Sequence, residues 1–544
     1  RMGDTDFRLC LLPLPLQSSP LILFSMERKN TISRKDLLLA TFLSLLSFAL
    51  YIRTLVPTLL TADAAEFQTL SYTLGMTHPS GYTTYVFLGK LFTLIPISNI
   101  AFRVNLMSAF FGAFAVGQVY LTIRKLGGWK VAAIAGAAGL MLNPLFWRRT
   151  IFAETYAPAA SMIASVFLLM LLWDESKNAR YLFLAGLVGG LSVGIHSTVV
   201  MTASAVLIYM IFKARRKRDW ISAAVGATLG LLLFFLAFLY LDQNNPPSSI
   251  YNTTYITNLS TRGLTPEEFD EPLERLFAIF PAESFWVYYF SATPEVIRSR
   301  LSEYINFYPR WEFALVLMGM VALFFHKKDG KSLLPEALYL LIAFTLVWGF
   351  AVTVAFGVYQ EFYCPVAVLV HIWLGVGLSA ILSGVASLLK GKQAQRLKNI
   401  NLMPSLLGVA FVAALLFHAK ADITLAIQEG YSTFIRDEKI YPIAKPDRYV
   451  RLSHQVLNKI EDDAIVFEIW DRLYTHVYTA HILDGRTGIA FHEAFPTLGQ
   501  STLDYIEANI DKRPIYFATL HPEISTYYDL NQVGDELYRL SKKD

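Results

Sequence analysis

Cysteine and charge are both scarce in this sequence. Its 544 residues include two cysteines, Cys10 and Cys364, which excludes a disulfide framework and the paired cysteines of a zinc site. Charged residues make up 17% of the chain, whereas a soluble domain usually holds about 25%. The formal net charge is +4, and the basic residues form no continuous face, so we expect no nucleic-acid binding. The same composition excludes the disordered, coiled-coil and collagen-like classes.

Apolar residues are correspondingly abundant. They make up 54% of the chain, the mean hydropathy is +0.42, and they gather in long runs between short clusters of lysine and arginine. This pattern is typical of a protein that crosses a membrane many times. A further apolar stretch, 82–97, contains Lys90 and ends at Pro96. The clear runs cover residues 36–56, 104–123, 131–147, 157–173, 181–195, 197–212, 219–240, 311–326, 333–356, 363–389 and 402–420.

The positions of lysine and arginine indicate how the ambiguous stretch 82–97 lies. If it lies along the membrane surface, every basic cluster falls on one side, and if it crosses, the strongest cluster at 213–218 moves outside. The loops 57–80 and 357–362 contain no lysine or arginine. The positive-inside rule therefore predicts about eleven spans, with 82–97 as a juxtamembrane helix. The cytoplasmic clusters would be Arg28, Lys29, Arg34 and Lys35, then Arg124, Lys125 and Lys130, then Lys177 and Arg180, then 213–218, then Lys327, Lys328 and Lys331, then Lys390, Lys392, Arg396 and Lys398.

The odd number of spans places the long loop 241–310 and the tail 421–544 outside the cytoplasm. The tail has strand-like apolar runs at 464–470 and 514–520, separated by helical and turn-rich sequence, and this predicts a small α/β domain. The loop contains two sequons, at Asn252 and Asn258, which are either glycosylation acceptors in a eukaryotic host or chance matches.

The predicted fold class is an all-α polytopic membrane protein with a small extracytoplasmic α/β domain at the C-terminus. It divides into an N-terminal leader and cytoplasmic segment (1–35), a transmembrane domain (36–420) and the tail domain (421–544). The stretch up to about Ser25 is either a weak leader or an upstream extension with Met26 as the start, and we favour the extension.

The first external loop holds the most informative polar residues. Asp63 and Glu66 are three positions apart, so a helical turn would place both on one face. Two carboxylates so placed suit general-base catalysis or metal ligation, although carboxylates at a helix start can equally serve the helix dipole. His78 adds a titratable group beside Pro79 and Gly81 in the same loop.

Further polar residues fall in the other external turns. Arg148 and Arg149 run against the positive-inside bias, so they suit an anionic partner such as phosphate, or they reach toward the interface as anchors. The turn 359–363 is rich in aromatic residues with one carboxylate, and we interpret it as part of an aromatic belt. The remaining candidates are Glu154 and Tyr156 in the second external turn and His196 in the third, where a structural histidine is the commoner case.

Seven of these polar residues come from three loops that are predicted to lie on one side of the membrane. They are Asp63, Glu66, His78, Arg148, Arg149, Glu154 and His196. A channel or transporter places polar residues at mid-span, whereas the mid-span positions here are almost all Leu, Ala, Gly, Phe and Val. The glycines and small residues at 132–139 and 186–194 indicate close helix packing instead. The pattern therefore favours an active site over a conduction path.

At these residues the sequence resembles the GT-C superfamily of membrane glycosyltransferases, and within it the transmembrane protein 260 family with its prokaryotic relatives. The resemblance covers roughly residues 36–215 and departs from the family pattern at Ser80 and at Thr61 and Ala62. The matching segments are Ala-Asp63-Ala-Ala-Glu66-Phe, Thr-His78-Pro79-Ser-Gly81-Tyr82, Ala153-Glu154-Thr-Tyr156 and Gly190-Leu-Ser-Val-Gly194-Ile-His196.

The resemblance implies inverting transfer of a sugar, most often mannose, from a polyprenyl- or dolichyl-phosphate donor to a hydroxyl of an exported protein. It implies Asp63 and Glu66 as catalytic residues, with Asp63 as the base. The substrate-binding residues would be His78, Tyr82, Arg148, Arg149, Glu154, Tyr156 and His196. No cofactor is required beyond the lipid-linked sugar, although the carboxylates could hold a divalent metal.

Other functions and locations stay open at this point. A flippase or transporter of a lipid-linked precursor is one alternative, and a GT-C enzyme that modifies a lipid or a cell-wall glycan is another. A eukaryotic host would imply the endoplasmic reticulum membrane and a prokaryotic host the plasma membrane, with the active face outside the cytoplasm in both cases.

Overall fold

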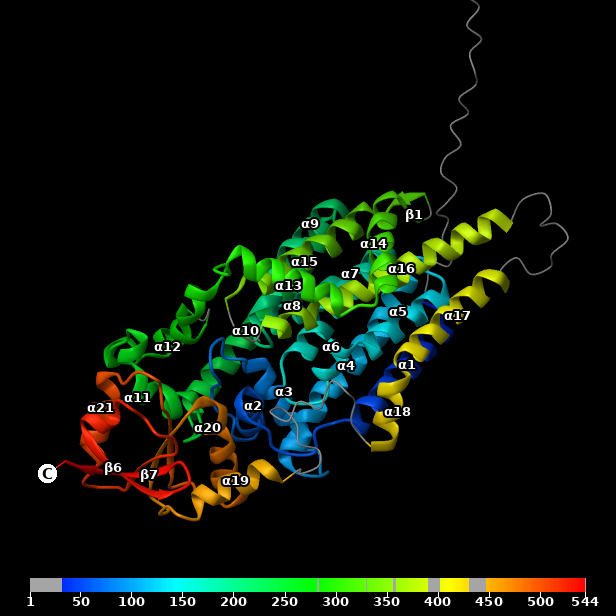
Figure 1. The fold of residues 1–544 in the computed structure, drawn as a ribbon. Helices are drawn as coiled ribbons and strands as arrows, with labels where there is room; N and C mark the ends of the chain where they lie inside the picture. The colour runs from blue at the N-terminus through cyan, green and yellow to red at the C-terminus, as the bar shows by residue number, and fades with distance from the viewer. Residues whose placement is uncertain are drawn as a thin grey trace, which may run out of the picture.

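The computed structural model describes residues 32–280, 283–328, 330–355, 359–389, 402–429 and 447–543. They form a long helical bundle with a small sheet-containing domain at one end (Figure 1). The leader expected before Ser25, the start at Met26 and the basic clusters at 28–29 and 390–398 lie outside the described residues.

All eleven apolar runs that the sequence predicts as spans are helical. The first part of the bundle consists of α1 (Arg34–Arg53), α2 (Ala62–Thr73), α3 (Thr83–Thr93), α4 (Ile100–Lys125), α5 (Lys130–Leu142), α6 (Pro144–Arg148), α7 (Tyr156–Ser176), α8 (Arg180–Ser192), η2 (Ser197–Thr202), α9 (Ala203–Lys213) and α10 (Lys217–Asn244). The external segment holds η3 (Tyr251–Tyr255), α11 (Ile256–Asn258), η4 (Ser260–Arg262), η5 (Pro266–Glu268), α12 (Pro272–Ile279), η6 (Glu283–Tyr288) and α13 (Pro294–Asn306). The bundle is completed by α14 (Arg310–Phe325), the short hairpin β1 (Lys327–Lys328) and β2 (Lys331–Ser332), α15 (Leu334–Thr353), η7 (Tyr359–Tyr363), α16 (Cys364–Leu389), α17 (Leu402–His418) and α18 (Lys420–Glu429).

The helices differ in whether they could cross a bilayer alone. Among the described residues, six are long and apolar enough, and up to eight candidates result if each of two bent helix pairs counts as one span. Three further apolar helices, 130–142, 180–192 and 197–213, are shorter. The chain is therefore a multi-pass membrane protein by length and composition, and the count of eleven spans stays a prediction. Helix α3 has eleven residues, about half of what a span needs.

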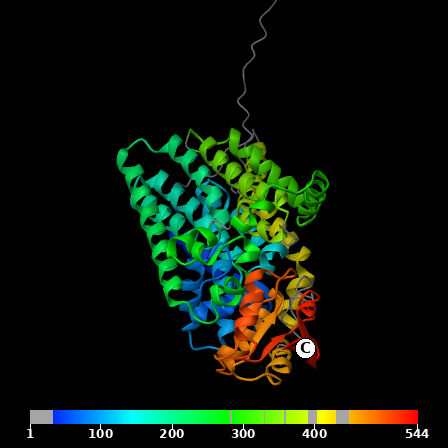
Figure 2. The same cartoon turned by 90° about the vertical axis from the view of Figure 1, so that its left-hand side faces the viewer.

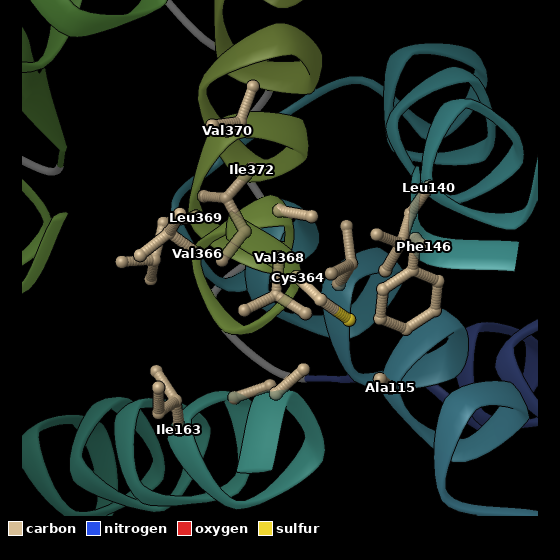
Figure 3. Packing of buried hydrophobic residues seen from close by; sticks show 14 of the residues in the cluster. Ala115, Leu140, Phe146, Ile163, Cys364, Val366, Val368, Leu369, Val370 and Ile372 are labelled. Carbon is tan, nitrogen blue, oxygen red and sulfur yellow. The ribbon is translucent and has the colours of Figure 1, made fainter. Parts of the chain in front are cut away.

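The core of the bundle is apolar and closely packed. Cys364 is fully buried at the start of α16 and lies near Phe146 and Leu140 from neighbouring helices (Figure 3). Helices α8 and α10 approach each other through glycines. A Cβ on Gly190 would stand 2.6 Å from the carbonyl oxygen of Ala227, and one on Gly230 would stand 2.5 Å from that of Leu187. The predicted close packing at 186–194 is thus confirmed.

The basic turns predicted on one side of the membrane meet at one end of the bundle. Lys328 donates to the carbonyl oxygen of Lys125 over 2.6 Å, and Lys213 forms ion pairs with Asp174 at 3.0 Å and Glu336 at 2.7 Å. Figure 1 shows β1 and the neighbouring ends of α9 and α14 at the upper end, and the C-terminal sheet at the lower end. The basic turns and the C-terminal sheet therefore lie at opposite ends of the bundle, as the distribution of lysine and arginine predicts.

The C-terminal part contains α19 (Arg448–Leu457), β3 (Ile465–Glu468), α20 (Trp470–Val477), η10 (Tyr478–Leu483), β4 (Ala490–Glu493), α21 (Gln500–Asn509), β5 (Ile515–Phe517), η11 (Ile524–Thr526), β6 (Tyr528–Gly534) and β7 (Leu537–Lys542). The strand order is β4-β3-β5-β7-β6. The two predicted strands are β3 and β5, which pair in parallel with Ile465 opposite Ile515. The predicted small α/β domain is present.

The C-terminal domain rests directly on the end of the bundle opposite the basic turns (Figure 2). The hydroxyl of Thr475 on α20 donates to the carbonyl oxygen of Leu60 over 3.1 Å, and the hydroxyl of Tyr478 accepts from the backbone N–H of Ala101 over 3.1 Å. The external segment 251–262 joins this contact. Asn258 is 1% exposed there and donates to the carbonyl oxygen of Glu493. A glycan on Asn258 is therefore incompatible with this fold. For this sequon the structure favours a chance match over a glycosylation acceptor.

Candidate active site

A cavity of about 320 Å³ lies where the bundle meets the C-terminal domain. It opens beside the carboxyl ends of the parallel strands β3 and β4, the edge at which sheets of this kind bind ligands. The lining draws on segments that are far apart in the sequence. Its residues are Asp63, His78, Pro79, Ser80, Tyr82, Tyr156, His196, Ser197, Thr198, Ile250, Arg262, Tyr289, Phe350, Phe362, Trp470 and Glu493.

Asp63 presents its carboxylate to this cavity from the first turn of α2. One oxygen, Oδ1, accepts a 2.8 Å hydrogen bond from the indole N–H of Trp470, and the other, Oδ2, lies 4.0 Å from Nε2 of His78. The side chain is 43% exposed. Its position also suits the helix dipole, so both interpretations of this carboxylate apply to the same residue. Trp470 therefore fixes one carboxylate oxygen of Asp63, and the other oxygen stays accessible to accept a hydrogen bond or a proton from a ligand.

Glu66 lies one turn further along α2 and has a different environment. Its side chain is fully buried, and it accepts from the backbone N–H of His78 at 2.6 Å and from the ring Nδ1 at 2.5 Å. The chain turns back to make this pair after α2 ends, where Leu74 adopts a left-handed conformation with a φ of +58° and its N–H caps the carbonyl oxygen of Leu70. Asp63 and Glu66, which the sequence places one helical turn apart, both face His78. Only Asp63 lines the cavity.

The charge on His78 follows from these neighbours. Burial lowers the pKa of His78, but the charges of Glu66 and Asp63 outweigh burial and raise it to about 9. Burial raises the pKa of Glu66, and the charge and hydrogen bonds of His78 oppose that rise. We therefore assign a cationic His78 at neutral pH, held by a buried carboxylate on one ring nitrogen and facing Asp63 with the other.

Aromatic rings and a neutral histidine form the opposite wall. The ring of His196 lies 5.9 Å from that of Tyr82, 5.1 Å from that of Tyr156 and 5.7 Å from that of Phe362. Burial, together with the charge of His78, lowers the pKa of His196 to about 3, so this ring is uncharged. Its Nδ1 accepts from the backbone N–H of Thr198 at 3.2 Å. Phe362 belongs to the turn interpreted as an aromatic belt, and that interpretation is wrong for this residue because it lines the cavity.

The two arginines of the second external turn lie apart from the cavity lining. Arg149 is buried and pairs with Glu361 at 2.5 Å and with Glu154 at 3.6 Å. Burial raises the pKa of Glu154, and the charge of Glu361 raises it further, whereas Arg149 opposes the rise. Arg148 is partly buried. The anionic partner that the sequence predicts for Arg149 is thus supplied by the protein itself, and Glu361 is a partner that sequence reasoning missed.

Three further cavity residues come from segments without any recognised motif. They are Arg262 in the external segment, Trp470 at the start of α20 and Glu493 at the end of β4. Trp470 ends the strand-like run predicted over 464–470, and this position was a usable signal because ligands gather at the carboxyl ends of parallel strands. Glu493 ends β4, a strand that the sequence analysis did not predict. Arg262 offered no such signal.

The described residues do not form a metal site. No group of three or more histidine, cysteine, aspartate or glutamate side chains among them could hold a metal ion. Glu66 is already engaged by His78 on both oxygens. The divalent metal considered from the sequence therefore finds no group of three such ligands in the described part of the chain.

Residues 63–220 match the family model of the Protein O-mannosyl-transferase TMEM260 N-terminal domain. The chain is 26% identical over 203 residues to Protein O-mannosyl-transferase TMEM260 of Mus musculus, which covers 36% of this chain and 29% of that protein. It is 24% identical over 252 residues to the protein of the same name in Dictyostelium discoideum, which covers 42% and 30%. The chain thus spans less than a third of the length of these relatives. The predicted resemblance to this family is confirmed.

Solved structures share the whole architecture at low sequence identity. ArnT from Cupriavidus metallidurans bound to undecaprenyl phosphate matches with a TM-score of 0.55 and 12% identity, over 93% of this chain and 98% of that one. The Archaeoglobus fulgidus oligosaccharyltransferase in complex with Zn and sulfate matches with a TM-score of 0.52 and 13% identity, over 93% and 73%. The chain thus shares its fold with these two membrane proteins over 93% of its length.

Proposed function

We propose, from the premise that this chain is a TMEM260-related protein with a GT-C fold, that it is an inverting glycosyltransferase. It would move a sugar from a polyprenyl- or dolichyl-phosphate donor to a hydroxyl acceptor. The observation that carries the proposal is the environment of Asp63, an accessible carboxylate held by Trp470 and faced by a cationic histidine in a cavity at the end of a membrane bundle.

The reaction follows from that carboxylate. Asp63 takes the proton of the acceptor hydroxyl as its oxygen attacks the anomeric carbon from the face opposite the phosphate. The new carbon–oxygen bond forms while the bond to the phosphate oxygen breaks, and the lipid phosphate leaves with that electron pair. Because phosphate is a good leaving group, no general acid is needed. A single displacement inverts the anomeric configuration.

The surrounding groups position the reactants. Glu66 fixes the ring of His78, and this places the cation 4.0 Å from the carboxylate of Asp63. Tyr82, Tyr156 and the neutral His196 supply a largely uncharged wall against which a sugar ring can lie. Glu154 and Arg149 hold that wall in place through their buried ion pair, while Arg148 stays a proposed contact of the anionic donor.

An apolar groove in the bundle suits the lipid chain of the donor. A cavity of about 440 Å³ is lined by α7, α8, η2, α9 and α10, almost entirely with apolar and small residues. Val200 lines both this groove and a smaller apolar cavity, and Phe350 lines both that cavity and the one around Asp63. The three cavities therefore adjoin one another through Val200 and Phe350, and we propose that they accommodate the lipid chain and its headgroup. Undecaprenyl phosphate is the ligand of the solved ArnT structure, which supports a donor of this class.

The groove predicts a dependence on lipid length. A Cβ at Gly189 would meet no atom within 4 Å, and this residue lines the groove. Gly189→Trp should therefore fill the groove without disturbing the helix pair. We expect KM for a long-chain donor to rise roughly tenfold, equivalent to about 1.4 kcal/mol of lost chain contact, while KM for a donor of two or three isoprene units stays unchanged. Equal effects on both donors would contradict the assignment of the groove.

The finer parts of the proposal rest on the family. The names of the relatives support mannose as the sugar and a protein as the acceptor, which would be a serine or threonine of an exported protein. We propose the eleven-span topology, with the basic turns in the cytoplasm and the Asp63 cavity on the opposite face. The membrane would be that of the endoplasmic reticulum in a eukaryote and the plasma membrane in a prokaryote.

The proposal is tested with the purified full chain in detergent. It is incubated with polyprenyl-phosphate mannose, glucose and galactose in turn, with and without a hydroxyl acceptor, and donor consumption is followed by mass spectrometry. We expect consumption of one donor, insensitive to a chelator. Consumption of none, together with transport of intact donor in proteoliposomes, would replace the glycosyltransferase with a flippase.

A further inference from the structure

Arg262 occupies a special place in the cavity around Asp63. It ends η4 in the external segment, and among the described residues it is the single arginine or lysine in the lining. The other arginine near the site, Arg149, is held by two carboxylates. The charge of His78 is likewise matched by Glu66. Arg262 is therefore the cavity cation that remains available to a ligand.

Two aromatic rings orient the guanidinium of Arg262. It lies 4.6 Å from the ring centre of Tyr255 and 5.2 Å from that of Phe495, which follows β4 in the C-terminal domain. The ring of Tyr255 is itself stacked on Phe269 at 4.6 Å and 6°. Rings engage the faces of a guanidinium and leave its N–H groups, which lie in the plane, to hydrogen-bond elsewhere. The structure thus fixes the plane of this cation from two domains.

The hydrogen bonds of Arg262 are incomplete. Its Nε is buried and has no hydrogen-bond partner within the described part of the chain. A buried N–H without a partner is costly, so such a group commonly marks a place that a ligand fills. Glu493 lines the same cavity and accepts from the hydroxyl of Thr254 at 3.0 Å. Burial raises the pKa of Glu493 to about 7, and the charge of Arg262 opposes that rise, so this carboxyl neutralises the arginine only in part.

We propose that Arg262 binds the phosphate of the lipid-linked donor and that the C-terminal domain completes this phosphate site through Phe495. This inference rests on the proposed function. The donor phosphate carries one negative charge while the sugar is attached and gains a second when the sugar leaves. A guanidinium can place two parallel N–H groups on phosphate oxygens, and such contacts strengthen as the charge grows.

The same chemistry explains why the C-terminal domain sits on the bundle. Trp470 from this domain holds the base, and Phe495 from this domain holds the cation for the leaving group. Asp63 would lose this hydrogen bond without the domain, and Arg262 would keep only the ring of Tyr255. An acidic acceptor peptide could also meet an arginine, and the experiment below separates that outcome from phosphate binding.

The test measures binding of undecaprenyl phosphate and of undecaprenol to the purified full chain in detergent, without any sugar. We expect the wild-type protein to prefer the phosphate, and Arg262→Ala to weaken phosphate binding roughly 10- to 100-fold while leaving alcohol binding unchanged. Arg262→Lys keeps the charge without the planar fork and should lie between the two. Arg298→Ala removes an exposed arginine of α13 and serves as the matched control.

Each outcome decides the proposal. A preference for phosphate that survives in Arg262→Ala would overturn it, and so would a loss of alcohol binding equal to the loss of phosphate binding. Inorganic phosphate should compete weakly, which shows that the headgroup is recognised together with its lipid. Competition by an acidic peptide but not by phosphate would assign Arg262 to the acceptor. Since no sugar is transferred, failure here is distinct from failure of the glycosyltransferase assignment, which the donor-consumption assay tests.

Discussion

Asp63→Asn should lower the rate of sugar transfer by about 10²- to 10⁴-fold, the range that a positioned general base contributes. Asparagine has nearly the same shape and can still accept from the indole N–H of Trp470, so the cavity should keep its geometry. It cannot take the acceptor proton, however. We expect kcat to fall while the binding of polyprenyl phosphate and the melting temperature stay near those of the wild-type protein.

The matched control is Asp471→Asn. Asp471 neighbours Trp470 on α20, but it is exposed and outside the cavity lining, so this variant should transfer sugar at the wild-type rate. If Asp63→Asn retains near-normal activity, Asp63 is not the base and the mechanism given above is wrong. If Asp471→Asn loses as much activity as Asp63→Asn, the effect arises from the C-terminal domain as a whole.

Glu66→Gln should have the largest effect on stability. Glu66 is fully buried and holds His78 at 2.5 Å, and breaking a buried ion pair by removing one partner typically costs about 3–5 kcal/mol. Burial would then dominate at His78 and lower its pKa, so the histidine would lose its charge at neutral pH. We therefore expect both a lower melting temperature and a large loss of transfer, because the group facing Asp63 is no longer a cation.

The raised pKa of His78 also predicts how the stability of the folded protein changes with pH. The folded-state pKa of His78 is about 9, above its usual value of about 6.5, so folding is favoured by proton binding. This contribution is fully present below about pH 6.5 and is lost as pH rises through 9. It amounts to about 3 kcal/mol for His78 alone. The wild-type melting temperature should fall over this window.

Glu66→Gln should show a flatter profile over the same window, since the raised pKa of His78 depends on the charge of Glu66. Glu507→Gln changes an exposed glutamate on α21 and should keep the wild-type profile. Differential scanning fluorimetry of the three proteins between pH 6 and 9.5 is sufficient. Identical slopes in the wild type and Glu66→Gln would show that His78 is not held as a cation by Glu66.

The sequence predicts the helices and the local part of the site well, and the reasons are physical. Apolar runs become helices because no other backbone conformation satisfies its own hydrogen bonds in a membrane. Lysine and arginine clusters mark one end of the bundle, and the structure joins them there through Lys328 and Lys213. Glu66 and His78 are twelve positions apart, and a helix followed by a short turn brings such neighbours together.

Long-range pairs could not be predicted from the sequence. Asp63 and Trp470 are 407 positions apart, and no periodicity reports that they meet. Arg149 is an apparent phosphate ligand by residue type, but the carboxylate that captures it, Glu361, lies in a turn that by itself resembles an aromatic belt. The guanidinium of Arg262 is oriented by the rings of Tyr255 and Phe495, and its sequence position alone predicts neither contact. In each case the tertiary partner decides what the residue does.

The most direct test of the account is the anomeric configuration of the transferred sugar. Purified protein is given a polyprenyl-phosphate sugar of known configuration and a hydroxyl acceptor, and the glycoside formed is examined by NMR spectroscopy. A single displacement with Asp63 as the base predicts a product of the opposite configuration, absent with Asp63→Asn. A product with the configuration of the donor, or transfer that persists in Asp63→Asn, would contradict the account.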